Sequence, residues 1–363
     1  MSSIWEGATI LITGGTGSLG SAFLRHALDT LKVKTIRVIS RDEYKQAEMA
    51  ATLTTKEQRR VRFLLGDVRD LQRLRRSFEG VDIVVHAAAL KRIDAIAYDP
   101  AESVKTNVLG ALNVVDAAID AGVSRVIGIS TDKSAAPHNL YGATKLVMER
   151  HFARAGVYAG GKSRETRFAC VRYGNVLGSR GSILGIWSNQ RAAGRPLQIA
   201  QEVTRFWLTL PQACEIIQYA GETMTGGEVF VPALPHGDLA TLALAAFPGA
   251  SQEWCGLRVG GEKAHETLVT SHEQAFALRL KHERFKGWVL HPEHPPRPGE
   301  SAYWLDVRSS DLPHITVEGC RELLRSAGLL QDAQEGHGEH AGQGEGKGGS
   351  DGHVDHDTVR AAG

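Results

Sequence analysis

The sequence predicts an α/β fold, in which a doubly wound parallel sheet is followed by a smaller C-terminal lobe. A short apolar run at 8–13 leads straight into a glycine-rich turn and then into a helical pattern of apolar residues. Further strand-like runs alternate with helix-like stretches up to about residue 172, as in βαβ units whose sheet is covered on both faces. Beyond about residue 175 the pattern becomes irregular, so we expect the regular part of the sheet in the first half of the chain.

The expected elements follow from these runs. Strands are expected at 8–13, 35–39, 61–65, 82–86, 125–129 and 167–172, and helices near 42–56, 70–78, 98–121 and 139–154. Crossovers in such a sheet are right-handed, which favours a doubly wound arrangement. We therefore expect a nucleotide-binding domain at 1–175 and a substrate-binding lobe at 176–330 that is interleaved with the last elements of the sheet.

The C-terminal tail, 331–363, has a different composition. It is rich in Gly, His, Asp and Glu and almost free of large apolar residues. Such a segment buries too little surface to offset its ordering entropy, so we expect it to be disordered. Its histidines could bind a transition metal, but we interpret them as solvated and predict no metal site.

Composition excludes several classes of protein. The chain has 363 residues, of which 42% are hydrophobic, enough to bury a sizeable core. It contains no apolar run of about 18 residues and no signal-peptide pattern, so we expect no membrane span. The net charge of +1 gives no basic field for nucleic acid. The four cysteines are widely spaced, which indicates reduced thiols in a cytoplasmic protein.

The glycine-rich turn predicts a dinucleotide site. Gly14 permits a tight turn, Gly17 lets the backbone approach a pyrophosphate, and Gly20 lets the following helix pack close to the strand. The helix N-terminus then offers free N–H groups to the anion. The cofactor-binding residues expected in this turn are Gly14, Thr16, Gly17, Ser18, Leu19 and Gly20.

The ends of the next strands indicate which dinucleotide binds. Arg41 follows the second strand, after Ser40, and Lys45 comes one helical turn later, so both cations could hold a 2′-phosphate and NADP is favoured over NAD. Alternatively, Asp42 and Glu43 form the first turn of a helix and pair with Lys45. Further cofactor contacts are expected from Asp67 and Val68 after the third strand and from Ala87 and Ala88 after the fourth. Asp67 could bind the adenine amino group or cap the next helix.

Tyr141 and Lys145 suggest an acid–base pair. They are spaced i, i+4 and therefore lie on one face of the predicted helix at 139–154. An ammonium about 4 Å from the phenol would lower its pKa by about three units at an effective dielectric of about 20. Tyr141 could then deprotonate a secondary alcohol while a hydride leaves, with Thr131 as a nearby hydroxyl donor and Lys145 also holding the nicotinamide ribose. After a glycine-rich turn, this spacing is typical of short-chain dehydrogenases/reductases.

Asp132 and Lys133 add a second acid–base pair at the end of the fifth strand. A simple alcohol dehydrogenase or a 4-epimerase has no use for it. Elimination of water beside a new ketone requires both a base for the acidified C–H and an acid for the departing hydroxyl. The two residues could instead form an ordinary loop ion pair, but their position relative to Tyr141 favours the chemical role.

The stretch STDKSAAPHNLYGATK at 130–145 resembles the UDP-N-acetylglucosamine 4,6-dehydratases of the extended short-chain dehydrogenase/reductase family, and most closely their C5-inverting type. Further matching blocks are ISRDEYKQ at 39–46, HAAALK at 86–91, VRYGNVLGSRGS at 171–182, TRFW at 204–207 and GEVFVP at 227–232. Retaining relatives typically carry Met where this chain has Tyr141, so the resemblance favours inversion.

The resemblance implies a complete reaction. Bound NADP, regenerated in each cycle, oxidises the C4 hydroxyl of UDP-N-acetylglucosamine, with Tyr141 as base. Lys133 removes the C5 proton and Asp132 protonates the leaving C6 hydroxyl. The hydride then returns to C6, and C5 is reprotonated on the opposite face, giving a 4-keto-6-deoxy-L-arabino-hexulose nucleotide. The relatives form dimers or hexamers, so a homo-oligomer is implied.

The resemblance also assigns ligand contacts by position. Lys91 is expected to contact both cofactor and sugar, Ser130 and Asn175 the sugar, and Arg205 and Arg258 the UDP diphosphate, a role for which guanidinium groups are suited. Glu262 is expected as a further substrate ligand, in the block RVGGEK at 258–263, which is one residue longer than in the family and lacks its proline. The loop expected beside the nicotinamide consists of Val176, Leu177, Gly178, Ser179 and Arg180.

Two kinds of alternative remain from the sequence. A 4-epimerase or a C5-retaining dehydratase could use the same fold. From a different class, the chain could be an NADP-binding regulator without activity, although a regulator has no need of Asp132, Lys133, Tyr141 and Lys145 together.

Overall fold

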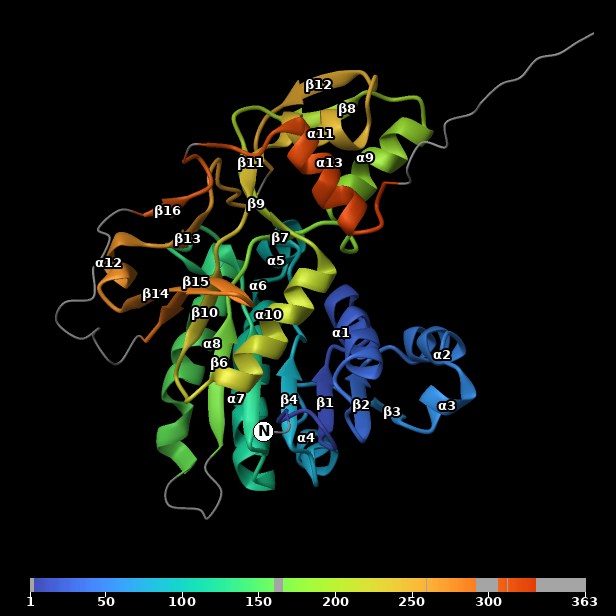
Figure 1. Cartoon of the computed structure of the whole chain (residues 1–363), viewed down its shortest axis with the longest axis vertical. Coiled ribbons are helices and arrows are strands. Elements are labelled where there is room, and N and C mark those ends of the chain that lie inside the picture. Colours follow the sequence, from blue (N-terminus) through green and yellow to red (C-terminus); the bar gives the residue numbers. More distant parts are fainter. Residues whose placement is uncertain (1–2, 160–165, 259, 292–305, 312, 331–363) are drawn as a thin grey trace, which may run out of the picture. The chain divides into compact units, whose positions relative to one another are not determined.

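A computed structural model describes residues 3–159, 166–258, 260–291, 306–311 and 313–330 (Figure 1). Its main sheet has the strand order β14-β15-β10-β6-β5-β4-β1-β2-β3. The parallel strands are β1 (Thr9–Thr13), β2 (Thr35–Ser40), β3 (Val61–Leu65), β4 (Ile83–His86), β5 (Arg125–Ile129), β6 (Arg167–Val171) and β10 (Val229–Pro232). The hairpin of β14 (Ala277–His282) and β15 (Phe285–Leu290) extends the sheet in the antiparallel direction. This arrangement confirms the doubly wound parallel sheet.

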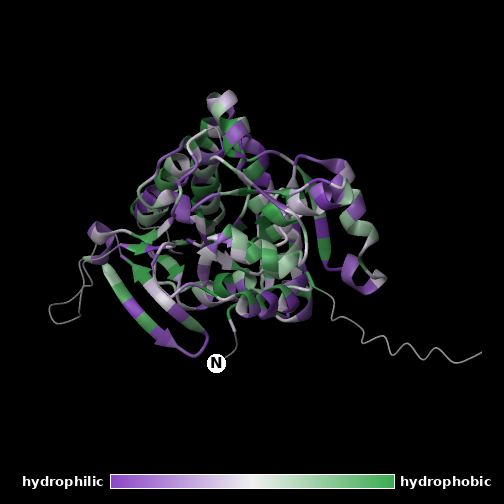
Figure 2. Cartoon of the chain, turned by 90° about the horizontal axis from the view of Figure 1, so that it is seen from above, coloured by the Kyte–Doolittle hydropathy of each residue, from purple (hydrophilic) through white to green (hydrophobic). Residues whose placement is uncertain are grey.

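Helices cover both faces of the sheet, since its central strands are apolar on both sides. Helices α1 (Ser18–Asp29) and α10 (Leu210–Thr223) share one core with β1, in which Phe23 and Ile217 are fully buried. Helices α4 (Leu71–Phe78), α7 (Gly110–Ala121) and α8 (Leu140–Arg154) share the core on the other face. Figure 2 shows hydrophobic residues gathered in the interior. The strand order reverses between β1 and β4, where the carboxyl ends of parallel strands leave a crevice.

The predicted helices at 42–56 and 98–121 are each divided in the structure. The first forms α2 (Glu43–Ala51) and α3 (Thr55–Gln58), because Thr54 starts a new helix with a capping box to Glu57. The second is preceded by α5 (Ile93–Tyr98) and consists of α6 (Pro100–Ser103), a π-helical turn η1 (Val104–Leu109) and α7. Pro100 has no N–H to donate and therefore begins a helix rather than continuing one.

A smaller lobe is built mainly from the second half of the chain. It contains strand pairs β8 (Leu197–Ala200) with β12 (Gln252–Cys255) and β13 (Thr267–Val269) with β16 (Val307–Arg308), and a sheet of β7 (Asn175–Val176), β9 (Thr204–Leu208) and β11 (His236–Asp238). Its helices are α9 (Ile183–Ala192), α11 (Leu239–Ala246), α12 (Ser271–Gln274) and α13 (Val317–Ser326). A separate apolar core forms around Trp187, Leu242 and Leu324.

The first compact unit of the chain ends at Leu330. The tail predicted to be disordered, 331–363, lies outside the described residues. No helix in the described ranges is long and apolar enough to cross a membrane. No cluster of three or more potential metal ligands occurs among the described residues either.

Candidate active site

A cleft of about 1890 Å³ lies between the carboxyl ends of the parallel strands and the lobe. Its walls include the glycine-rich turn after β1, the segments after β2, β4 and β5, the start of α8 and the loop after β7. Every predicted site residue lines this cleft except Asp132 and Gly178. The fold therefore brings the predicted cofactor and substrate residues together.

The glycine-rich turn has the close contacts that its sequence predicts. Gly14 has a φ of +63°, and a Cβ there would lie 2.7 Å from the Cα atom of Ala88. A Cβ on Gly20 would lie 2.5 Å from the Cα of Gly15, so only glycine lets α1 pack this close to the turn. Gly17 is the N-cap of α1 and offers no side-chain cap, which leaves the first N–H groups of the helix directed at the cleft.

The segment after β2 forms the helix start that the alternative interpretation of the sequence predicts. Asp42 caps α2 by accepting from the backbone N–H of Lys45, and it also forms a 2.6 Å ion pair with the Lys45 amine. Lys45 is thus paired within its own helix, as the alternative predicts. The guanidinium of Arg41 is about half exposed at the cleft and lies 3.5 Å from Asp67. Arg69 also pairs with Asp67, and Asp70 rather than Asp67 caps α4.

The segment after β4 is held by buried polar groups. His86 is fully buried, and its Nδ1 atom lies 2.8 Å from the Thr13 hydroxyl. Burial lowers the His86 pKa to about 3, so this imidazole is neutral. Asn107, in the π-helical turn, bonds both backbone polar groups of Leu90 and the hydroxyl of Thr144 in α8. Asn107 therefore ties the loop that carries Lys91 to the helix that carries Tyr141.

Tyr141 and Lys145 lie in the cleft wall, but they are not coupled as predicted. The Lys145 amine donates to the Ile129 carbonyl at 2.7 Å, and burial lowers its pKa to about 8. Burial raises the pKa of Tyr141 to about 12, against the lowering effects of Lys133 and of a hydrogen bond from Thr131. The expectation that Lys145 alone lowers the phenol pKa toward 7 is wrong for the protein by itself, because the lysine is held by β5 and desolvation dominates.

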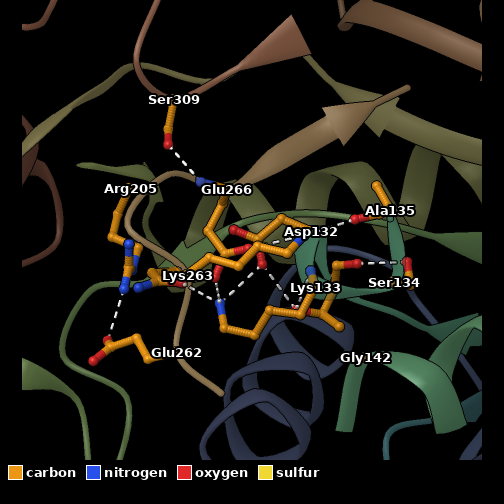
Figure 3. A network of polar contacts seen from close by, with 12 residues as sticks. Asp132, Lys133, Ser134, Ala135, Gly142, Arg205, Glu262, Lys263, Glu266 and Ser309 are labelled. Atoms are coloured by element: carbon orange, nitrogen blue, oxygen red, sulfur yellow. Dashed lines mark hydrogen bonds and ion pairs between the residues drawn. The ribbon is translucent and has the colours of Figure 1, made fainter. Parts of the chain in front are cut away.

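Lys133 lies at the centre of a polar network (Figure 3). It belongs to the 3-10 turn η2 (Asp132–Ser134), directly after β5. Its Nζ atom lies 3.0 Å from Asp132 Oδ1, 3.2 Å from Asn175 Oδ1 and 3.1 Å from Glu266 Oε1. Despite burial, the two carboxylates raise the pKa of Lys133 above its usual range, so Lys133 rests as an ammonium.

Asp132 lies behind Lys133 rather than in the cleft wall. Its side chain is fully buried, and Oδ1 also accepts a 3.0 Å hydrogen bond from the Thr131 hydroxyl. Oδ2 has no hydrogen-bond partner among the described residues. Desolvation raises the Asp132 pKa, opposed by Lys133. Asp132 thus faces the two cleft-lining residues beside it, Thr131 and Lys133.

The arginines predicted to hold a diphosphate differ in their environment. Arg205 is almost fully buried and pairs with Glu262 at 2.7 Å, while also donating to the carbonyls of Thr204 and Ala264. Arg258 has an exposed position, and its backbone N–H donates to the same Glu262 carboxylate. Glu262 therefore organises this wall of the cleft by holding Arg205 and the backbone of Arg258.

The loop after β7 closes another side of the cleft. Gly178 points away from it, since a Cβ there would meet Leu329 at 2.8 Å, and its φ is +69°. The Arg180 N–H donates to the Ser18 hydroxyl at 2.9 Å, which joins this loop to the glycine-rich turn. Gly178 is thus needed for the shape of the loop, whereas its neighbours line the cleft.

The comparison with family models places these features in a known group. Residues 10–285 match the model described as "Polysaccharide biosynthesis protein", and this range contains the whole cleft. The chain belongs to that family.

Curated relatives of the chain include a 4,6-dehydratase and a 4-epimerase. The chain is 42% identical over 272 residues to the UDP-N-acetylglucosamine 4,6-dehydratase (inverting) of Campylobacter jejuni strain 81-176, covering 74% of this chain and 80% of that protein. It is 40% identical to the UDP-glucose 4-epimerase of Rickettsia felis, covering 89% and 97%. The resemblance to 4,6-dehydratases noted in the sequence is confirmed by the first relative.

Solved structures support the same fold. The X-ray structure of Pen from Bacillus thuringiensis aligns with a TM-score of 0.81 and 33% identity, covering 89% of this chain and 98% of Pen. A dTDP-glucose 4,6-dehydratase from Streptomyces venezuelae, solved with NAD bound, aligns with a TM-score of 0.61. At 24% identity, the latter shows the shared fold alone.

The sequence did not point to two residues that shape the site, Glu266 and Gly142. Glu266 holds Lys133 but lies in no recognised motif. Gly142 sits inside the Tyr141–Lys145 spacing, and a Cβ there would lie 2.0 Å from the Lys133 carbonyl oxygen. The spacing predicts the helix face, but it contains no signal for this contact with the loop.

Proposed function

We propose that the protein is a UDP-N-acetylglucosamine 4,6-dehydratase that inverts C5. The observation that carries this proposal is that Lys133 and Tyr141, from two different elements, line one cleft beside a dinucleotide-type glycine turn. The 42% identical relative named for this activity supports the same substrate and outcome. The product would be a UDP-linked 4-keto-6-deoxy sugar of L-arabino configuration.

The residues present fit a nicotinamide dinucleotide. The backbone of Gly14 packs so closely against the backbone of Ala88 that a side chain at position 14 would not fit. A pyrophosphate-binding turn requires such a glycine. The buried Thr106 hydroxyl lines the cleft and lacks a hydrogen-bond partner in the part of the chain that the structure describes. When bound, the nicotinamide supplies a hydride acceptor for C4 and a hydride donor for C6. The cation at Arg41 supports NADP as the form used.

The chain's own residues supply the proton transfers. Tyr141 must be ionised to take the C4 hydroxyl proton; burial raises its pKa to about 12, and the ammonium of Lys133 acts against that rise. A proton passed from Lys133 Nζ to Asp132 Oδ1 leaves a neutral amine that accepts the C5 proton. The proton on Asp132 then reaches the departing C6 hydroxyl through Thr131, which bonds Asp132 and lines the cleft. Elimination therefore restores the Asp132 carboxylate and the Lys133 ammonium. C5 then takes a proton from solvent on its opposite face, and Tyr141 releases the C4 proton to solvent, so the protons balance over the cycle.

Incubation with UDP-N-acetylglucosamine in deuterated water tests the function. We expect loss of one water, solvent deuterium at C5, inverted C5 configuration and no net consumption of cofactor, all read by NMR and absorbance. Unchanged UDP-N-acetylglucosamine in the presence of bound cofactor would overturn the proposal and favour a regulator without activity.

A 4-epimerase is the second candidate function, favoured by the Rickettsia felis relative, which matches over nearly its whole length. In the same experiment an epimerase would give a C4 epimer that keeps its C6 hydroxyl and incorporates no deuterium at C5. A C5-retaining dehydratase would release water and leave C5 in its original configuration.

The resemblance also supports a homo-oligomer, a dimer or hexamer. Light scattering of the full chain would measure its size.

A further inference from the structure

Glu266 contacts the proposed base from the smaller lobe. It lies just before β13, 133 residues after Lys133, and its side chain is almost fully buried. Its Oε1 atom lies 3.1 Å from Lys133 Nζ, a distance equivalent to that of Asp132. A buried carboxylate is costly unless it is paired, so this contact is part of a built arrangement.

The position of Glu266 is fixed independently of Lys133. Its backbone N–H donates to the Ser309 hydroxyl at 2.8 Å, and Ser309 in turn donates to the Thr204 carbonyl. Figure 3 shows Glu266 between Ser309 and Lys133, with Arg205 and Lys263 near it. The carboxylate is therefore presented to Lys133 by the lobe, whereas Asp132 is presented by the sheet.

The three acceptors around Lys133 use all three N–H groups of its ammonium. Asp132, Asn175 and Glu266 come from three separate segments, so they hold Nζ in one place at the cleft wall. An ammonium has no lone pair with which to accept a proton from carbon. Lys133 becomes a base only after one of the two carboxylates beside it takes a proton.

We propose that Glu266 is a positioning residue for Lys133: it fixes the Nζ atom at the cleft wall, and its charge sets the pH range over which Lys133 acts as a base. This inference rests on the proposed dehydratase function and adds a residue to it. Glu266 does not line the cleft, so it acts through Lys133 and not on the substrate.

Several charged groups besides Glu266 act on the protonation of Lys133. The groups that face it from every packed element are Asp132, Tyr141, Arg205, Lys263 and Glu266. Arg205 opposes the protonated form of Lys133, whereas both carboxylates favour it. Lys133, Arg205 and Lys263 lower the pKa of Glu266, so Glu266 stays ionised and its charge persists at neutral pH.

Three substitutions separate the charge of Glu266 from its contact. Glu266→Gln keeps an oxygen acceptor and removes the charge, so the rise of the dehydration rate with pH should move to lower pH by about 1–3 units, with KM unchanged. Glu266→Asp keeps the charge and should keep the position of the wild-type profile. Glu266→Ala removes the anchor as well and should lower the maximal rate roughly 10- to 100-fold.

Glu253→Gln is the control, because it makes the same chemical change at a glutamate of β12 that accepts a hydrogen bond from Gln198 and not from Lys133. The profile is measured as water loss by NMR across pH, together with cofactor content and thermal unfolding to show that each variant is folded. If Glu266→Gln is folded and its pH–rate profile superposes on that of the wild type, the inference about Glu266 is wrong and the proposed function still stands. Wild-type protein that releases no water would instead overturn the proposed function, and this inference with it.

Discussion

Replacing Gly142 by alanine is expected to disable elimination while leaving cofactor binding intact. An ideal Cβ on Gly142 would lie 2.0 Å from the carbonyl oxygen of Lys133 and 2.8 Å from its carbonyl carbon, and contacts under 3.0 Å are essentially never observed. Both obstructing atoms are backbone atoms, so no side-chain rotation relieves the clash. The helix is held at this point because the Gly142 N–H donates to the Asn139 cap at 2.9 Å. The loop that carries Lys133 must therefore retreat.

The size of the effect follows from this distance. The Lys133 carbonyl has to move by at least about 1 Å, and a misplacement of that size in a catalytic group costs roughly 100-fold in rate. Overpacking of this kind also lowers the free energy of unfolding by about 1–3 kcal/mol. Tyr141 lies on the helix side of the clash, so its reaction with the C4 hydroxyl should be affected less than the Lys133 step.

The assay measures three properties of Gly142→Ala: bound cofactor by absorbance, reduction of that cofactor by UDP-N-acetylglucosamine, and water loss by NMR. Gly156→Ala is the matched control, because nothing lies within 4 Å of its added Cβ. We expect Gly142→Ala to keep the first two properties and lose most of the third. Water loss at the wild-type rate would refute the steric reasoning.

Three further predictions test other parts of the site. Lys133→Met should retain cofactor and oxidise C4 more slowly, because the Tyr141 pKa loses the lowering effect of the ammonium, but it should release no water; continued dehydration would reject Lys133 as the base. Arg41→Ala should weaken NADP binding about 10- to 100-fold and NAD binding little, measured by calorimetry; an equal effect on both would argue against NADP selection by Arg41. His86 stays neutral in the folded protein, with a pKa of about 3, while the unfolded chain binds a proton below about 6.5. The free energy of unfolding should therefore fall by about 3 kcal/mol from pH 7 to pH 4 through His86, and urea titrations of His86→Asn should lack that part of the loss.

The sheet could be predicted because its signals are local. Buried parallel strands are continuous apolar runs, and β4, with Ile83, Val84 and Val85 all buried, is recognisable from four residues. The glycine-rich turn likewise has its reason within a few residues. Where a helix divides, the signal is also local but weaker: Thr54 and Pro100 mark new helix starts within stretches whose apolar pattern continues.

The chemistry was less predictable because it depends on where long side chains end. The i, i+4 spacing places Tyr141 and Lys145 on one face, but it does not show that the Lys145 amine bonds the Ile129 carbonyl. In the same way, Asp132 and Lys133 are neighbours in sequence and share a 3-10 turn, yet Lys133 lines the cleft whereas Asp132 is buried behind it.

Glu266 shows how the lobe, which comes from the second half of the chain, contributes to the chemistry of residues in the first half. Asp132 and Glu266 are balanced by Lys133 and by Lys263, which lies 3.9 Å from Glu266, while Arg205 is paired with Glu262. Such a group of charges survives burial because its members neutralise one another. A proton that moves from Lys133 to Asp132 leaves the total charge of this group unchanged. The sheet alone would leave Lys133 with one carboxylate; the lobe adds the second and closes the site around it.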